Sequence, residues 1–126
     1  MKQEYVAASK TIVVVEDDDL LRSLMVDAVR ALDFNVVDFA TADDALIHVM
    51  LESDSVALVV ADLTVPGQID GVELAEMLYE RYPLIPFILT TGYVELDRVF
   101  KGGVKFLPKP WALEELSQSI LSLVSR

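Results

Sequence analysis

The feature that most constrains the fold is a regular alternation of short strand-like runs with longer stretches of helical periodicity. β-Branched and other apolar residues form five short runs, which lie at residues 11–15, 35–39, 57–62, 87–91 and 104–107. Between and after these runs, apolar residues recur every three or four positions, which is typical of amphipathic helices. Strands that alternate with helices form a parallel sheet with helices on both faces, because crossover connections are right-handed. The pattern therefore predicts a doubly wound α/β domain with a five-stranded parallel sheet.

The helical pattern is weakest between the fourth and fifth runs. Val94, Val99 and Phe100 allow one or two helical turns, which Gly102 and Gly103 would end. We therefore expect a short or irregular fourth helix.

Length and charge narrow the class of protein further. The 126 residues suffice for one domain, and we expect residues 1–10 to be a flexible lead-in to a domain at 11–126. The formal net charge of −11 repels nucleic-acid phosphates and anionic lipids, so we expect no direct binding to nucleic acid or membrane. The chain has no cysteine, and no apolar run approaches the ~20 residues of a membrane span. We expect a cytoplasmic location.

A single carboxylate, that of Asp62, stands where the most apolar run ends. The preceding residues 57–61 are small or apolar, as in a strand buried on both faces. Ligands of open parallel sheets bind at the carboxyl ends of the strands, so the position of Asp62 makes it a candidate binding or catalytic residue. The alternative is that Asp62 only starts a turn towards Pro66.

Four successive acidic residues, 16–19, follow the first run. Their mutual repulsion is costly unless a cation or solvent absorbs the charge. Asp18 or Asp19 also has a plain structural use, because either can cap the helix that follows.

The ends of the first, third, fourth and fifth strands can line one crevice of such a sheet. They carry Glu16 and Asp17, then Asp62, Thr91 and Lys109. Three converging carboxylates suit Mg²⁺, which prefers oxygen ligands. A hydroxyl and an ammonium could contact a phosphoryl group, whose transfer depends mainly on positioning and electrostatics. Asp62 is the candidate nucleophile, since the paired acids suit metal ligation instead.

These residues resemble the receiver domain of two-component response regulators over about residues 10 to 125. The resemblance rests on five segments in the expected order: Val14-Val15-Glu16-Asp17-Asp18, Asp62 with Pro66, Asp70-Gly71, Thr91-Gly92, and Phe106-Leu107-Pro108-Lys109-Pro110. It implies a flavodoxin-like (βα)5 fold with strand order 2-1-3-4-5.

The resemblance also implies a role for each site residue. Asp62 would accept a phosphoryl group from a histidine kinase or a histidine phosphotransfer protein. Asp17, Asp62 and the carbonyl of Thr64 would bind Mg²⁺, with Glu16 acting through water. The resemblance further implies that Thr91 and Lys109 contact the phosphoryl group, and that the chain catalyses only its own phosphorylation and dephosphorylation.

Two further features follow from the resemblance. Phe106 takes the place of the switch aromatic, although burial alone would also account for a phenylalanine on a strand. The bond between Lys109 and Pro110 is expected to be cis, which is a minority state even for proline.

The chain departs from the family pattern at Phe106, which lacks the hydroxyl of the more familiar tyrosine, and in two further places. The loop of residues 66–71 has one extra residue, and the span from Thr91 to Lys109 is several residues shorter than usual. Tyr93 and Thr64 flank the expected path of water to the phosphoaspartate. We hypothesise that Tyr93 slows autodephosphorylation by shielding the acyl phosphate.

Other functions share parts of this pattern. A receiver-shaped interaction module would work without phosphorylation, but it does not need all five site residues. A phosphohydrolase of the haloacid dehalogenase type needs an acid two residues after the nucleophile, where this chain has Thr64. A flavodoxin-like electron carrier needs a phosphate-cradling loop where this chain has four acids.

The main expectation is thus a receiver that switches the binding of an unknown downstream protein. The sequence has no basic recognition helix, which leaves three arrangements open: a stand-alone regulator, a phosphorelay shuttle, or a receiver cut from a larger protein.

Overall fold

The computed structural model describes residues 10–92 and 104–124 of the chain. Its centre is one parallel five-stranded sheet in the order β2-β1-β3-β4-β5. The strands are β1 (Thr11–Val15), β2 (Asn35–Phe39), β3 (Val56–Asp62), β4 (Phe87–Thr91) and β5 (Val104–Pro108). The predicted fold class and strand order are confirmed.

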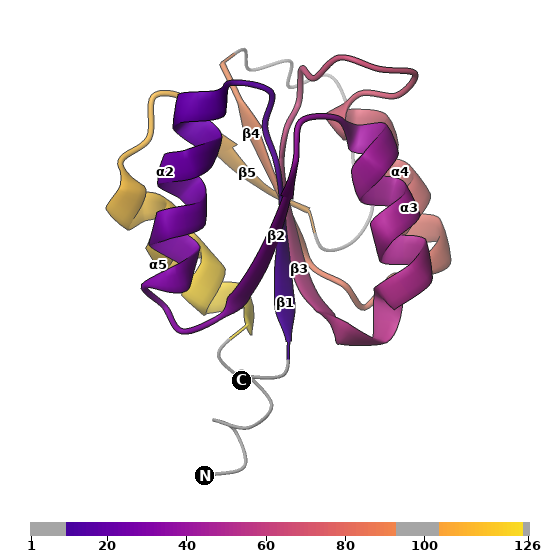
Figure 1. The fold of residues 1–126 in the computed structure, drawn as a ribbon, viewed down its shortest axis with the longest axis horizontal. Coiled ribbons are helices and arrows are strands. Elements are labelled where there is room, and N and C mark those ends of the chain that lie inside the picture. The colour runs from indigo at the N-terminus through magenta and orange to yellow at the C-terminus, as the bar shows by residue number, and fades with distance from the viewer. Residues whose placement is uncertain (1–9, 93–103, 125–126) are drawn as a thin grey trace, which may run out of the picture.

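Helices cover both faces of the sheet (Figure 1). One face carries α2 (Asp19–Arg30) and α5 (Leu113–Val124), and the other carries α3 (Ala42–Glu52) and α4 (Gly71–Arg81). A short 3₁₀ turn, η1 (Ser53–Ser55), connects α3 to β3. Among the described residues, no helix is long and apolar enough to cross a membrane.

The core consists of two layers, because successive strand residues point to opposite faces. In β1, Ile12 and Val14 pack beneath α2 and α5, whereas Val13 and Val15 pack beneath α3 and α4. The central strand β3 alternates in the same way and is buried along most of its length. This double burial explains why β3 has no polar residue before Asp62.

Each of the three helices that follow β1, β2 and β3 begins at a side-chain cap. The backbone N–H of Leu21 donates to Asp18 at the start of α2, and Thr41 caps α3 in the same manner. Asp70 and Glu73 form a reciprocal capping box at the start of α4. Of the two candidate caps for α2, Asp18 and Asp19, the structure uses Asp18.

Not every large apolar residue of the amphipathic helices is buried. Leu20, Leu24, Met50 and Met77 have 72%, 42%, 43% and 41% of their surface exposed. Each of these residues has an apolar neighbour on the same helix. A helix that lies on a sheet buries only one narrow stripe of its surface, so one residue of each pair stays exposed. Their neighbours Met25, Val49 and other stripe residues fill that stripe instead.

Two expectations lie outside the described residues. The short or irregular fourth helix falls in residues 93–103, and most of the expected lead-in falls in residues 1–9. The peptide bond between Lys109 and Pro110 is cis, as predicted.

Candidate functional site

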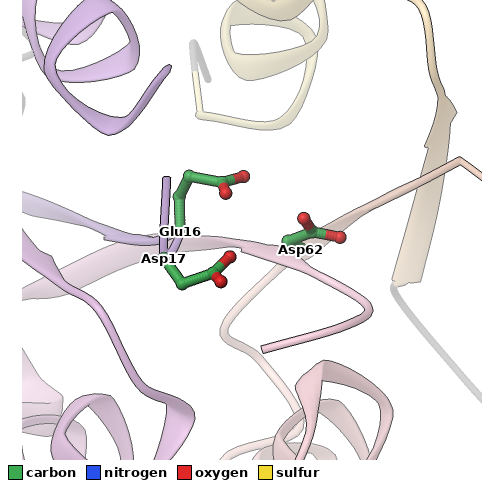
Figure 2. A group of neighbouring side chains, drawn as sticks. All are labelled: Glu16, Asp17 and Asp62. Carbon is green, nitrogen blue, oxygen red and sulfur yellow. The ribbon is translucent and has the colours of Figure 1, made fainter. Parts of the chain in front are cut away.

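The carboxyl ends of the strands bring the predicted site residues together at one edge of the sheet. Glu16 and Asp17 directly follow β1, Asp62 ends β3, and Thr91 ends β4. Figure 2 shows the carboxylates of Glu16, Asp17 and Asp62 as neighbours at this edge. Lys109 follows β5 and reaches the same point.

The three carboxylates lie close enough to share one ion. Glu16, Asp17 and Asp62 each offer an oxygen, and these oxygens lie within 4.8 Å of one another. Glu16 and Asp62 are buried, whereas Asp17 is exposed to solvent. The site therefore combines two buried carboxylates with one, that of Asp17, that is open to solvent.

Lys109 joins the acidic group by an ion pair with Asp62. Its Nζ lies 2.9 Å from Oδ2 of Asp62 and 3.9 Å from Oε1 of Glu16. Its backbone N–H donates to the carbonyl oxygen of Thr91 at 2.7 Å, which fixes the start of the turn after β5. The hydrogen bond and charge of Asp62 outweigh the effect of burial, so the pKa of Lys109 is raised.

Backbone contacts also orient Asp62, because its other carboxylate oxygen accepts a hydrogen bond from the main chain. Its Oδ1 accepts a hydrogen bond from the N–H of Thr64 at 3.2 Å. The N–H of Gly71 donates to the carbonyl of Leu63 at 2.9 Å, and a Cβ at Gly71 would overlap the carbonyl oxygen of Asp62. A glycine is needed at position 71 because the start of α4 approaches the end of β3 this closely.

Glu16 is an unusual carboxylate, because it is only 2% exposed. Burial, opposed by a hydrogen bond from the N–H of Asp18 and reinforced by the charge of Asp62, raises its pKa from 4.5 to about 7. Its Oε1 has no hydrogen-bond partner among the described residues. A buried oxygen of this kind is costly to leave unsatisfied.

The donor set fits Mg²⁺. All the candidate ligand atoms are oxygens, the carboxylates are grouped, and the open side at Asp17 leaves room for water. The Oε1 of Glu16, which accepts no hydrogen bond from the described residues, lies 3.9 Å from the Nζ of Lys109 beside this group. A divalent cation would relieve the repulsion among the three acids.

The remaining predicted site residues lie at different distances from this centre. Thr91 is buried at the end of β4, and Thr64 is exposed just beyond β3. Phe106 lies on β5 with 40% of its surface exposed, so burial in the core does not explain it. Tyr93 lies outside the described residues.

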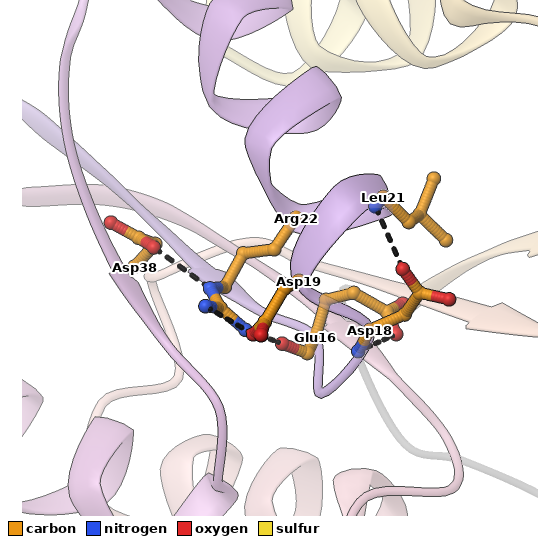
Figure 3. A network of polar contacts seen from close by, with 6 residues as sticks. All are labelled: Glu16, Asp18, Asp19, Leu21, Arg22 and Asp38. Atoms are coloured by element: carbon orange, nitrogen blue, oxygen red, sulfur yellow. Dashed lines mark hydrogen bonds and ion pairs between the residues drawn. The ribbon is translucent and has the colours of Figure 1, made fainter.

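Sequence reasoning missed two side-chain networks that hold loops of the site. Arg22 of α2 contacts Glu16, Asp19 and Asp38 (Figure 3). Asp43 of α3 accepts hydrogen bonds from the backbone N–H groups of Gln68 and Ile69. The sequence offers one signal for these networks: Asp19 and Arg22 are three residues apart, which is the spacing of an ordinary helical ion pair.

The sheet order, the acids after β1 and β3 and the lysine after β5 together define the receiver class of α/β proteins. The chain belongs to the response regulator receiver domain family, whose model it matches over residues 12–121. Receiver domains act as phosphoacceptors in two-component signalling, and acidic residues bind Mg²⁺ in this family.

Known proteins of this kind are similar to most of the chain. The C4-dicarboxylate transport transcriptional regulatory protein DctD of Rhizobium meliloti is 31% identical over 90% of this chain and 25% of its own length. The sensor kinase CckA of Brucella abortus is 32% identical over 95% of this chain and 13% of its own length. The chain thus spans a quarter or less of these two relatives.

A solved structure supports the same assignment. The receiver domain from the hybrid histidine kinase CckA has a TM-score of 0.79 and 29% sequence identity to this chain. The similarity covers 90% of this chain and 98% of that receiver.

Proposed function

We propose that this chain is a phosphoacceptor in which Asp62 receives a phosphoryl group from a phosphohistidine. The observation that carries the proposal is the ion pair of 2.9 Å between Lys109 and Asp62 within a group of three carboxylates. A nucleophilic carboxylate beside a fixed cation can stabilise the charge that develops during phosphoryl transfer. The donor would be a histidine kinase or a histidine phosphotransfer protein in the cytoplasm.

The transfer is a simple displacement at phosphorus. A carboxylate oxygen of Asp62 forms a bond to phosphorus while the bond from phosphorus to the histidine nitrogen breaks. The electron pair of that bond stays on the imidazole ring, which leaves as the neutral base when its other nitrogen carries a proton. The product on this chain is an aspartyl phosphate, a mixed anhydride.

The residues of the acidic group would hold the cofactor. Asp17, Asp62 and the carbonyl of Thr64 would ligate Mg²⁺ directly, and Glu16 would act through water. When bound, the ion would screen the negative charge of the incoming phosphoryl group.

Other side chains would bind the transferred group and report its presence. Lys109 would exchange its contact with Asp62 for one with a phosphoryl oxygen, and the hydroxyl of Thr91 would donate to another oxygen. Phe106, exposed on β5, would change its orientation when Thr91 moves and so alter the binding of a downstream protein.

The main competing function is a receiver-shaped interaction module that works without phosphorylation. The three grouped carboxylates and the lysine that reaches them count against it, because such a module needs neither. A phosphohydrolase with an aspartate nucleophile is disfavoured, because Thr64 cannot act as its general acid.

Labelling with acetyl phosphate tests the proposal. We expect the wild-type chain to incorporate one phosphoryl group with Mg²⁺ and none with a chelator. Asp62→Asn should abolish the labelling, whereas Asp44→Asn, which changes an exposed acid in the first turn of α3, should not. Labelling that survives in Asp62→Asn, or that needs no Mg²⁺, would overturn the proposal. A wild-type chain that is never labelled would favour the interaction module.

The partner requires a separate experiment. Phosphotransfer profiling against the histidine kinases of the source organism should find one kinase or phosphotransfer protein that labels the chain much faster than the others. Equal and slow labelling by all of them would contradict a dedicated signalling role.

A further inference from the structure

We propose that Arg22 is a positioning residue that directs the acidic turn after β1 towards a single magnesium site. The inference rests on the proposed function, since it assumes that Glu16, Asp17 and Asp62 bind Mg²⁺. It goes further by assigning a task to a side chain outside that site.

Arg22 makes three contacts with three different segments (Figure 3). Its Nη1 donates to the backbone carbonyl of Glu16 at 2.8 Å. Its Nε donates to Oδ2 of Asp38 on β2 at 2.9 Å, and its Nη2 donates to Oδ1 of Asp19 at 2.8 Å. The Arg22 side chain is only 19% exposed, so these contacts are partly shielded from water and salt.

The contact with the carbonyl of Glu16 bears directly on the site. The carbonyl belongs to the planar peptide unit that leads into Asp17, so its direction limits where the Asp17 carboxylate can lie. The same turn is held at two other points. The N–H of Glu16 donates to the carbonyl of Phe39, and the N–H of Asp18 donates to the Glu16 side chain, both at 3.0 Å. Arg22 completes this set of restraints.

The contacts of Arg22 also divide the acids of the turn between two tasks. Asp19 and Asp38 are paired with the guanidinium, and Asp18 accepts the N–H of Leu21 as a helix cap. Glu16 and Asp17 are left to face Asp62. Without Arg22, Asp19 and Asp38 would be unpaired carboxylates that could draw a cation away from the site.

The chemistry favours arginine for this task over lysine. A guanidinium presents several N–H donors in a rigid planar fork, whereas an ammonium is a point charge on a flexible stem. The three acceptors lie in three directions, on α2, on β2 and on the turn after β1. A lysine could satisfy the charge but could not hold all three together.

The direction in which Mg²⁺ affinity changes when Arg22 is replaced distinguishes a positioning role from a purely electrostatic one. Replacing Arg22 by a neutral residue removes a positive charge that repels the cation, so Coulomb's law alone predicts tighter Mg²⁺ binding. If Arg22 positions the turn, the same substitution weakens binding.

The test is a Mg²⁺ titration of the metal-free chain by calorimetry and by the fluorescence of Trp111, the one tryptophan in the sequence. We expect Arg22→Gln and Arg22→Lys each to raise the Kd by about tenfold, as is typical when a residue that orients metal ligands is lost. Arg30→Gln makes the same charge change in the last turn of α2 and should alter the Kd by less than about twofold.

Three results would overturn the proposed positioning role of Arg22, and a fourth would overturn the proposed function. An unchanged or lower Kd in Arg22→Gln overturns the proposal, and so does a wild-type Kd in Arg22→Lys, since charge alone would then suffice. A lower melting temperature of the metal-free variants with an unchanged Kd would assign Arg22 to stability only, which also overturns it. If the wild-type chain itself binds no Mg²⁺, the proposed function fails first.

Discussion

The Nζ of Lys109 lies 2.9 Å from Oδ2 of Asp62, although 47 residues separate the two in the sequence. Parallel strands create this proximity, because β3 and β5 both end at the same edge of the sheet. Under the proposed function, negative charge would develop beside this ammonium. Transfer would then need no large rearrangement of Lys109.

Replacing this lysine should slow phosphorylation without preventing folding. We expect Lys109→Gln to reduce the rate of labelling of Asp62 by about a hundredfold, which is typical for loss of one fixed electrostatic donor. Rates of phosphoryl incorporation from a phosphohistidine donor measure the effect. Lys105→Gln, which removes an exposed charge from β5, is the matched control and should keep the wild-type rate. Equal rates in the two variants would contradict the role of Lys109.

Glu16 should make the metal-free chain less stable as pH rises. Its pKa is 4.5 in the unfolded reference and about 7 in the fold, so the folded state holds the proton more tightly. The stabilising contribution is complete below pH 4.5 and is lost as pH rises through about 7. The loss is on the order of 3 kcal/mol.

Urea unfolding in a chelator can isolate this contribution. Glu16→Gln cannot titrate at position 16, whereas all other acids titrate in both proteins. The free energy of unfolding of the wild type should therefore fall relative to that of Glu16→Gln between pH 4.5 and about 7. A difference between the two proteins that stays constant over this range would refute the prediction.

Gly71 should tolerate no side chain, since a Cβ there would overlap the Asp62 carbonyl. We expect Gly71→Ala to lower the free energy of unfolding by about 2 kcal/mol, as for overpacking in a closed site. Because the strain falls on the backbone of Asp62, labelling by acetyl phosphate should slow as well.

Gly92→Ala provides the control for that substitution. A Cβ at Gly92 meets no atom of the described residues within 4 Å, so the free energy of unfolding should change by less than about 0.5 kcal/mol. Similar costs at positions 71 and 92 would show that the closeness of α4 to Asp62 is not the cause.

Tyr93 should lengthen the life of the aspartyl phosphate, by the shielding inferred from its position two residues after Thr91. We expect Tyr93→Ala to speed the loss of phosphate severalfold after excess donor is removed. Tyr93→Phe keeps the ring and should decay at the wild-type rate. An unchanged decay rate in Tyr93→Ala would exclude shielding by this residue.

Local sequence patterns were sufficient to predict the described strands and to predict which carboxylates lie close together. The alternation of short β-branched runs with amphipathic stretches predicted the strands to within a residue or two, because sheet burial demands apolar residues on both faces. Placement at strand ends also identified Glu16, Asp17 and Asp62, which the fold brings together.

Burial on the helices was less predictable. Leu20 and Met77 share the apolar character of the buried stripe, yet both are exposed. The exposed fraction depends on how each helix is rotated on the sheet, and this rotation is set by packing with residues distant in sequence.

The sequence by itself determined the fold class and the set of acids near the site, since both follow from local periodicity and from where strands end. The tertiary structure decided how those acids are used: Asp18 caps α2, Arg22 pairs with Asp19 and Asp38, and Glu16 is buried with a raised pKa. Four adjacent carboxylates look equivalent along the chain. They differ only once the fold has given each its own partners and its own exposure to water.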